Sequence, residues 1–188
     1  MGLGNVLFGR KKLKEPAGER LFALTTAAIT LDTESNLKPA GAGAIVYKQL
    51  SSGAFTQADQ EIEQLLQGVA ADAGSKLDRK TDSFGFEWVI VRDKDLEDQV
   101  TAVHAVASEF EAKGFGAQLL AATFAFKGGK NPVYWIYGFK TGTFWPFVPT
   151  GAKERDNAEE LELKAKLEPE LPVEPDLSRW LALYDAPI

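Results

Sequence analysis

His104 is the only histidine in the chain, and it is the first residue to consider for catalysis or metal binding. A Ser or Cys nucleophile normally needs a histidine base, but the chain has no cysteine and no GxSxG motif. No second histidine, cysteine or carboxylate pair is spaced to complete a metal site with it. We therefore expect His104 to be a packed or half-exposed structural residue. We predict no catalytic residue, no metal ligand and no cofactor.

Two short polar segments contain charged residues that could hold a ligand. Arg79 and Asp82 lie in one segment, before an apolar stretch, and Arg155, Asp156 and Asn157 follow a long aromatic stretch. Functional residues favour loops, and a helix that begins after Asp156 could accept an anion at its N-terminus. The simpler interpretation is a solvated turn in the first segment and a helix cap in the second. Both interpretations stay open at the level of sequence.

The stretch 131–151, NPVYWIYGFKTGTFWPFVPTG, is rich in aromatic residues and ends at the second polar segment. Its side chains alternate with period two around a central Thr-Gly dipeptide, which predicts a β-hairpin with a two-residue turn. Pro146 has no N–H to donate, so its strand is expected at a sheet edge. Core packing is the default for these aromatic side chains. Trp145 and Lys140 are nevertheless candidates for a ligand pocket or a partner surface.

The elements that would position these residues follow from the hydrophobic periodicity. The predicted helices cover 19–30, 55–69, 95–113, 157–167 and a short segment after Asp176. The predicted strands cover 41–49, 84–92, 115–127 and the two arms of the hairpin, whereas 74–83 is predicted to be a polar loop. Because a helix precedes three consecutive strands, the sequence indicates an α+β fold, an antiparallel sheet with helices packed on it.

Several local features of these helices can be compared directly with a structure. Thr56 is the predicted N-cap of the second helix, and Asp156 that of the fourth. The fourth helix is expected to bury Ala158, Leu161 and Ala165 and to expose Glu159, Glu160 and Glu162. The last short helix is expected to bury Leu177, Trp180, Leu181 and Tyr184.

Composition narrows the class of protein. The 188-residue chain has 45% hydrophobic residues and a formal net charge of −6, which is typical of a globular protein and argues against nucleic-acid binding. No apolar run approaches the roughly 20 residues needed to span a bilayer, so we expect a cytoplasmic protein. Residues 1–14 form a basic segment that is either a mobile terminus or a peripheral contact with the anionic inner face of the membrane. Residues 15–188 are predicted to form a single α+β domain.

Segments along nearly the whole chain resemble one protein family. The most specific are TDSFGF at 81–86, GTFWPF at 142–147 and RDNA at 155–158. Their order and spacing are similar to those of the PspA-associated protein PspAB family. The resemblance implies a partner of PspA, a coiled-coil membrane-stress protein, in the phage-shock type of envelope-stress response, with no enzymatic activity. The predicted layout also resembles, more loosely, the YbjN-like and type III secretion chaperone-like folds, whose members bind other polypeptides.

Three hypotheses about function follow. The first is a non-enzymatic adaptor that binds PspA. The alternative is a ligand-binding or enzymatic domain in which Arg79, Asp82, Arg155 and Asp156 surround an aromatic pocket. A third is a homodimer in which the edge strand of the hairpin pairs with a second copy.

Overall fold

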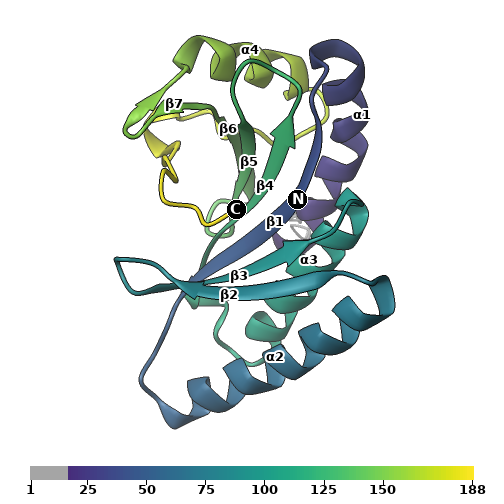
Figure 1. Cartoon of the computed structure of the whole chain (residues 1–188). Helices are drawn as coiled ribbons and strands as arrows, with labels where there is room; N and C mark the ends of the chain where they lie inside the picture. Colours follow the sequence, from purple (N-terminus) through teal and green to yellow (C-terminus); the bar gives the residue numbers. More distant parts are fainter. Residues whose placement is uncertain (1–16) are drawn as a thin grey trace, which may run out of the picture.

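The computed structural model describes residues 17–188, and the predicted basic segment at 1–14 lies outside them. Six strands form one antiparallel sheet in the order β2-β3-β1-β4-β5-β6 (Figure 1). They are β1 (Lys38–Lys48), β2 (Lys76–Thr81), β3 (Phe86–Arg92), β4 (Leu119–Lys127), β5 (Val133–Gly138) and β6 (Thr143–Phe147). Two very short strands, β7 (Pro149–Gly151) and β8 (Glu154–Arg155), pair with each other after β6.

The helices complete an α+β fold, which confirms the predicted class. The α-helices are α1 (Ala23–Ser35), α2 (Gly53–Ala73), α3 (Leu96–Ala112) and α4 (Asn157–Leu167). Three short 3₁₀ helices are η1 (Ala17–Phe22), η2 (Gly116–Gln118) and η3 (Leu177–Arg179). No helix within 17–188 is long and apolar enough to cross a membrane.

Capping residues set the ends of the two long helices. The side chain of Ser52 accepts a hydrogen bond from the N–H of Phe55 at 3.2 Å, so α2 begins before the predicted cap Thr56. Gly74 ends this helix in the left-handed conformation. Asp95 caps α3 by accepting the N–H of Glu97 at 2.9 Å.

The segment predicted as a loop at 74–83 contains the strand β2, so this prediction was wrong. Leu77 lies opposite Val91 and Arg79 opposite Val89 in an antiparallel ladder with β3. The strand lies at the margin of the sheet, and only Leu77 supplies an apolar side chain. An edge strand exposed to solvent on most sides lacks the alternation that identifies strands in sequence.

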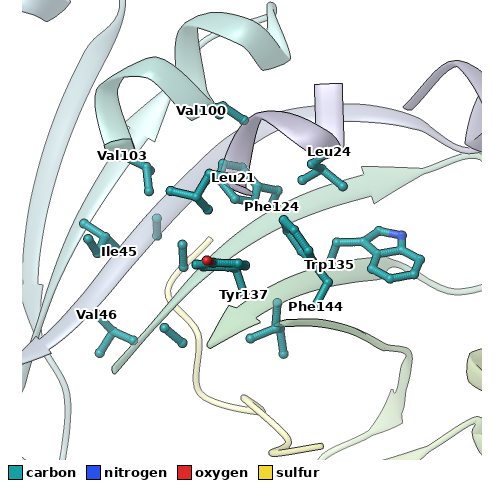
Figure 2. Packing of buried hydrophobic residues seen from close by; sticks show 14 of the residues in the cluster. Leu21, Leu24, Ile45, Val46, Val100, Val103, Phe124, Trp135, Tyr137 and Phe144 are labelled. Atoms are coloured by element: carbon teal, nitrogen blue, oxygen red, sulfur yellow. The ribbon is translucent and has the colours of Figure 1, made fainter. Parts of the chain in front are cut away.

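Helices cover one face of the sheet. Tyr47 of β1 packs on Phe110 of α3 at a ring distance of 4.7 Å and on Phe55 of α2 at 6.4 Å. Farther along the same face, Leu21 and Leu24 lie over the aromatic side chains of β4, β5 and β6 (Figure 2). These side chains are Phe124, Trp135, Tyr137 and Phe144, and all are fully buried. The aromatic stretch is therefore core, as its default interpretation predicted.

The C-terminal segment, residues 172–188, contacts the other face and the outer edge of β6. The indole N–H of Trp145 donates to the carbonyl of Leu181 at 3.0 Å, and Tyr184 packs edge-on against Phe147 at 5.1 Å. Trp180 is buried, but Leu177 and Leu181 are 51% and 64% exposed. The expectation that both leucines are buried was wrong, because η3 spans only three residues and its chain continues in irregular conformation.

The hairpin of β5 and β6 is present, with a longer connection than the predicted two-residue turn. Residues 139–142 join the strands, and the N–H of Gly142 donates to the carbonyl of Gly138 at 2.8 Å. Pro146 lies on the edge strand, as predicted. The N–H of Phe144 donates to the carbonyl of Pro172 at 2.9 Å, and the carbonyl of Phe144 accepts the N–H of Glu174 at 2.8 Å. The chain thus covers this edge itself at Phe144, which disfavours pairing of the hairpin edge with a second copy at that position.

Two glycines offer a matched test of backbone constraint. Gly128, in the β4–β5 turn, has φ of 129°, and a Cβ there would overlap the carbonyl oxygen of Asn36. We expect Gly128→Ala to destabilise the fold by about 2–4 kcal/mol through strain and overlap. Gly68 lies inside α2 with open space around it, so Gly68→Ala is expected to stabilise by about 0.5–1 kcal/mol. Urea unfolding checks both values, and equal effects would contradict the assignment.

Candidate functional site

The seven candidate residues do not form one site. Arg79 and Asp82 belong to β2 and the turn after it, at one margin of the six-stranded sheet. Lys140, Trp145 and the segment 155–157 lie on or after the hairpin, at the opposite margin. The aromatic pocket that would unite Arg79, Asp82, Arg155 and Asp156 is therefore not formed.

Arg79 joins β2 to the helix layer. Its guanidinium forms ion pairs with Asp59 at 2.6 Å and Glu63 at 3.0 Å, both on α2. It also donates to the hydroxyl of Tyr47, which itself donates to Asp59 at 2.6 Å. One turn of α2 is thereby connected to the strands β1 and β2.

The surroundings of Tyr47 and Arg79 shift the pKa of both side chains upward. Burial, reinforced by the hydrogen bond to Asp59, raises the pKa of Tyr47 well above its ordinary value. Burial alone would lower the pKa of Arg79, but the hydrogen bond to Asp59 and the neighbouring charges raise it. These shifts keep the Tyr47 hydroxyl protonated and the Arg79 guanidinium charged near neutral pH, which suits both groups to holding α2 against β1 and β2.

A cleft of about 310 Å³ adjoins Arg79 between α2 and β2. Its lining combines apolar and polar side chains, namely Glu63, Leu66, Gln67, Leu77, Asp78, Arg79 and Val89. No metal-binding group of three or more His, Asp or Glu side chains occurs within 17–188.

Asp82 shapes the turn between β2 and β3. Its carboxylate accepts the N–H groups of Phe84 and Phe86 at 2.9 Å and the indole N–H of Trp88 at 3.0 Å. Burial alone would raise the pKa of Asp82, but the hydrogen bonds from Trp88 and the backbone lower it below its ordinary value. The solvated-turn interpretation is correct for the position, although the side chain is a structural acceptor.

The lowered pKa of Asp82 predicts a pH-dependent contribution to stability. A depressed pKa in the folded state stabilises the fold above the ordinary value of 3.8, and this contribution is lost as pH falls through the folded pKa. We expect Asp82→Asn to cost about 1–2 kcal/mol at neutral pH, since an amide cannot accept all three bonds.

Urea unfolding of both chains as a function of pH measures this difference. The gap between wild type and variant should be constant above pH of about 5 and should shrink below about 4. A gap that does not change with pH would contradict the role of the ionised carboxylate.

Arg155 forms the most buried ion pair of the candidate set. Its Nε lies 2.9 Å from both carboxylate oxygens of Glu160, and its Nη2 lies 2.8 Å from Oε2. Its Nη1 donates to the carbonyl of Trp180 at 2.9 Å, and the guanidinium lies over the ring of Phe147 at 5.2 Å. Glu160 also accepts the N–H of Val148 at 2.9 Å.

The prediction that Glu160 is solvated was therefore wrong. The residues that α4 buries are Glu160, Leu163 and Leu167, whereas Leu161 is 47% exposed. The signal was present in the sequence, because these three residues follow the i, i+3, i+7 spacing of one helix face. It was hidden because the first of them is charged, and its partner Arg155 lies before the helix begins.

Removal of the Glu160 carboxylate should leave Arg155 and the N–H of Val148 without their buried acceptor. We expect Glu160→Ala to destabilise the fold by about 3 kcal/mol. Glu162→Ala is the matched control, because Glu162 is exposed and pairs with Lys166 across one helical turn. Its effect should stay within about 0.5 kcal/mol. Equal urea midpoints for both variants would refute the buried role of Glu160.

Asp156 and Asn157 differ in their roles. Asp156 caps α4 by accepting the N–H of Glu159 at 3.0 Å, as predicted. Burial, together with the negative charges of Asp156 and Glu162, raises the pKa of Glu159. The helix N-terminus is thus already negatively charged, which disfavours binding of an anion there. Asn157 remains exposed at the first position of the helix.

The remaining predicted residues also separate into core and surface. Trp145 is only 5% exposed, so it is not available as a contact residue. Lys140 is exposed in the hairpin connection. His104 is half-buried and packs on Phe22 at a ring distance of 5.1 Å, as expected of a structural histidine.

The exit of the hairpin contains the candidate residue Asn157, but the sequence did not predict the exposed side chains of Leu161 and Leu177 beside it. A cavity of about 110 Å³ opens there, between α4 and η3, and Arg155, Glu160 and Trp180 form its inner lining. Asn157, Leu161 and Leu177 form its exposed rim. We refer to these three residues as the hairpin-exit surface.

Taken together, the antiparallel sheet, the helices packed on it and the charged residues committed to internal contacts define an α+β protein. The model of the PspAB family, described as PspA associated protein B, matches residues 1–188, and the chain belongs to that family. No curated protein and no solved structure matches the chain. The looser likeness to YbjN-like and type III secretion chaperone-like folds stays a prediction.

Proposed function

We propose that this protein is a non-enzymatic adaptor that binds PspA in the envelope-stress response. The observation that carries the proposal is the match to the family of PspA-associated proteins over the whole chain. The partner is expected to be a PspA-like coiled-coil protein, and nucleic acid is not expected because the chain is acidic.

The arrangement of the candidate residues favours an adaptor over the enzymatic alternative. Arg79 and Arg155 are each held by carboxylates of their own chain, and Asp82 is held by N–H groups. An enzyme would need such groups to face a common pocket, whereas these groups lie at opposite margins of the sheet.

The hairpin-exit surface is the part of this protein that we assign to PspA. Leu161 and Leu177 expose 47% and 51% of their surfaces beside a small cavity, and buried contacts fix the backbone beneath them. Exposed apolar side chains on a rigid support suit the apolar stripe of a partner helix. In this proposal the protein is cytoplasmic, and residues 1–14 provide peripheral contact with the inner membrane face.

Co-purification with PspA from cells tests this assignment. We expect the variant Leu161→Asp/Leu177→Asp to bind at least about tenfold more weakly, because charges would enter the apolar contact. Leu65→Asp is the matched control, since Leu65 is 41% exposed on α2, away from this surface. It should bind as wild type does.

Two further outcomes complete the experiment. Absence of any PspA binding by the wild-type chain would refute the adaptor function, and unchanged binding by the double variant would refute only the surface. Deletion of residues 1–14 should lower recovery with membranes while leaving binding to purified PspA intact.

A further inference from the structure

The two edge strands of the sheet differ in whether another segment of the chain covers them. Residues 172–174 cover the β6 edge at Phe144, as described above. The opposite edge, β2, has no covering segment among residues 17–188 and is exposed along most of its length. An open edge strand presents unpaired N–H and C=O groups that can pair with another strand.

The ladder between β2 and β3 shows which backbone groups face outward. The N–H of Asp82 donates to Phe86, and hydrogen-bonded pairs alternate along an antiparallel ladder. The backbone groups of Leu77, Arg79 and Thr81 therefore point away from β3. No residue within 17–188 forms a backbone hydrogen bond with them.

We propose that β2 pairs antiparallel with β2 of a second copy, centred on Arg79, to form a symmetric dimer with a continuous sheet. This register places Leu77 of each copy opposite Thr81 of the other, so the outward backbone groups of both strands meet. The proposal concerns the chain alone and does not rest on binding to PspA.

Charge complementarity selects this register. On the face away from the helices, Asp78 of one copy lies opposite Lys80 of the other, and Arg92 of its own chain is a second cationic neighbour at 2.9 Å. Lys76 lies opposite Asp82, whose carboxylate is already bonded within its own turn, so the two Asp78–Lys80 pairs provide the complementarity. If the pairing is centred on Asp78 instead, Asp78 faces itself and Lys76 faces Lys80. Lysines on an edge strand normally discourage pairing with foreign strands. Here the alternating charges of Lys76, Asp78 and Lys80 are self-complementary, because opposite charges directly across a ladder stabilise it.

The residue on the symmetry axis is compatible with close approach of two copies. Arg79 faces Arg79 of the second copy, but each guanidinium already forms ion pairs with Asp59 and Glu63. Their repulsion is therefore compensated within each chain.

An exposed aromatic residue supplies a separate argument. Phe84, in the β2–β3 turn, is 75% exposed, the highest value among the large hydrophobic residues described. In the proposed register this turn extends past Lys76 of the second copy toward the end of its α2, near Gly74. A phenylalanine otherwise left in water is thereby placed beside a second protein surface.

Sedimentation of the purified chain over a wide concentration range tests the dimer. We expect wild type to show a monomer–dimer equilibrium. Lys80→Asp should weaken dimerisation by about tenfold, because like charges would then oppose each other twice per dimer. Asp78 also pairs with Arg92 of its own chain at 2.9 Å, so the charge-swapped variant is Asp78→Lys/Lys80→Asp/Arg92→Glu. It should restore dimerisation to within about threefold of wild type, because the opposed charges are again complementary both between and within the chains.

Controls separate the interface from folding. Lys140→Asp makes the same change of charge as Lys80→Asp, but at the opposite margin of the sheet, and should leave dimerisation unchanged. Circular dichroism and urea unfolding at low concentration establish that each variant folds. In wild type, amide exchange at Leu77, Arg79 and Thr81 should slow with rising concentration, and in Lys80→Asp it should not.

Three results would overturn the proposal. They are a wild-type chain that stays monomeric throughout, a Lys80→Asp variant that dimerises as tightly as wild type, and a folded charge-swapped variant as weak as Lys80→Asp. A strand added to β2 only by PspA would produce the first of these results.

Discussion

The carboxylate of Glu160 holds together three parts of the chain: the end of the hairpin, the start of α4 and the C-terminal segment. It accepts from the backbone just after β6, pairs with Arg155 before α4, and through that arginine reaches the carbonyl of Trp180. A buried charge is tolerated only when its lone pairs are satisfied, and here backbone and guanidinium donors supply the bonds. The position of α4, the path of the C-terminal segment and the shape of the hairpin-exit surface all depend on this group.

The ion pairs and hydrogen bonds of Arg79 have an equivalent role at the other margin of the sheet. It fixes α2 to a strand that has few apolar side chains of its own. Arg79 and Arg155 therefore stabilise elements that have few apolar side chains of their own. Their charges are used inside the fold, and the surfaces left for partners consist of apolar side chains and open backbone.

The sequence predicted the elements whose burial is regular and missed those whose stability depends on distant partners. The helices α2 and α3, the strand β3 and the hairpin have clear periodicity, and their residues pack as that periodicity requires. The strand β2 has charged residues at most positions and gains its structure from β3 and α2, which no local pattern reveals. The prediction that Glu160 is exposed was wrong for the same reason, because a pattern based on hydrophobicity assigns every carboxylate to the surface, including one that is buried with a partner. The polar segment before α4 was located correctly, whereas the segment predicted as a loop at 74–83 contains β2. In both segments the candidate side chains act within the fold, and only their spatial neighbours could show this.

The four tryptophans report on three different parts of the structure. The indole of Trp88 is bonded to Asp82 in the β2–β3 turn, and Trp135 lies in the centre of the core. Trp145 is bonded to the carbonyl of Leu181, and Trp180 to that of Glu174, so both monitor the C-terminal segment. Because an indole emits at longer wavelength when water reaches it, release of that segment would give an optical signal distinct from opening of the core. The fold thus contains its own set of spectroscopic labels, placed at the contacts on which its surfaces depend.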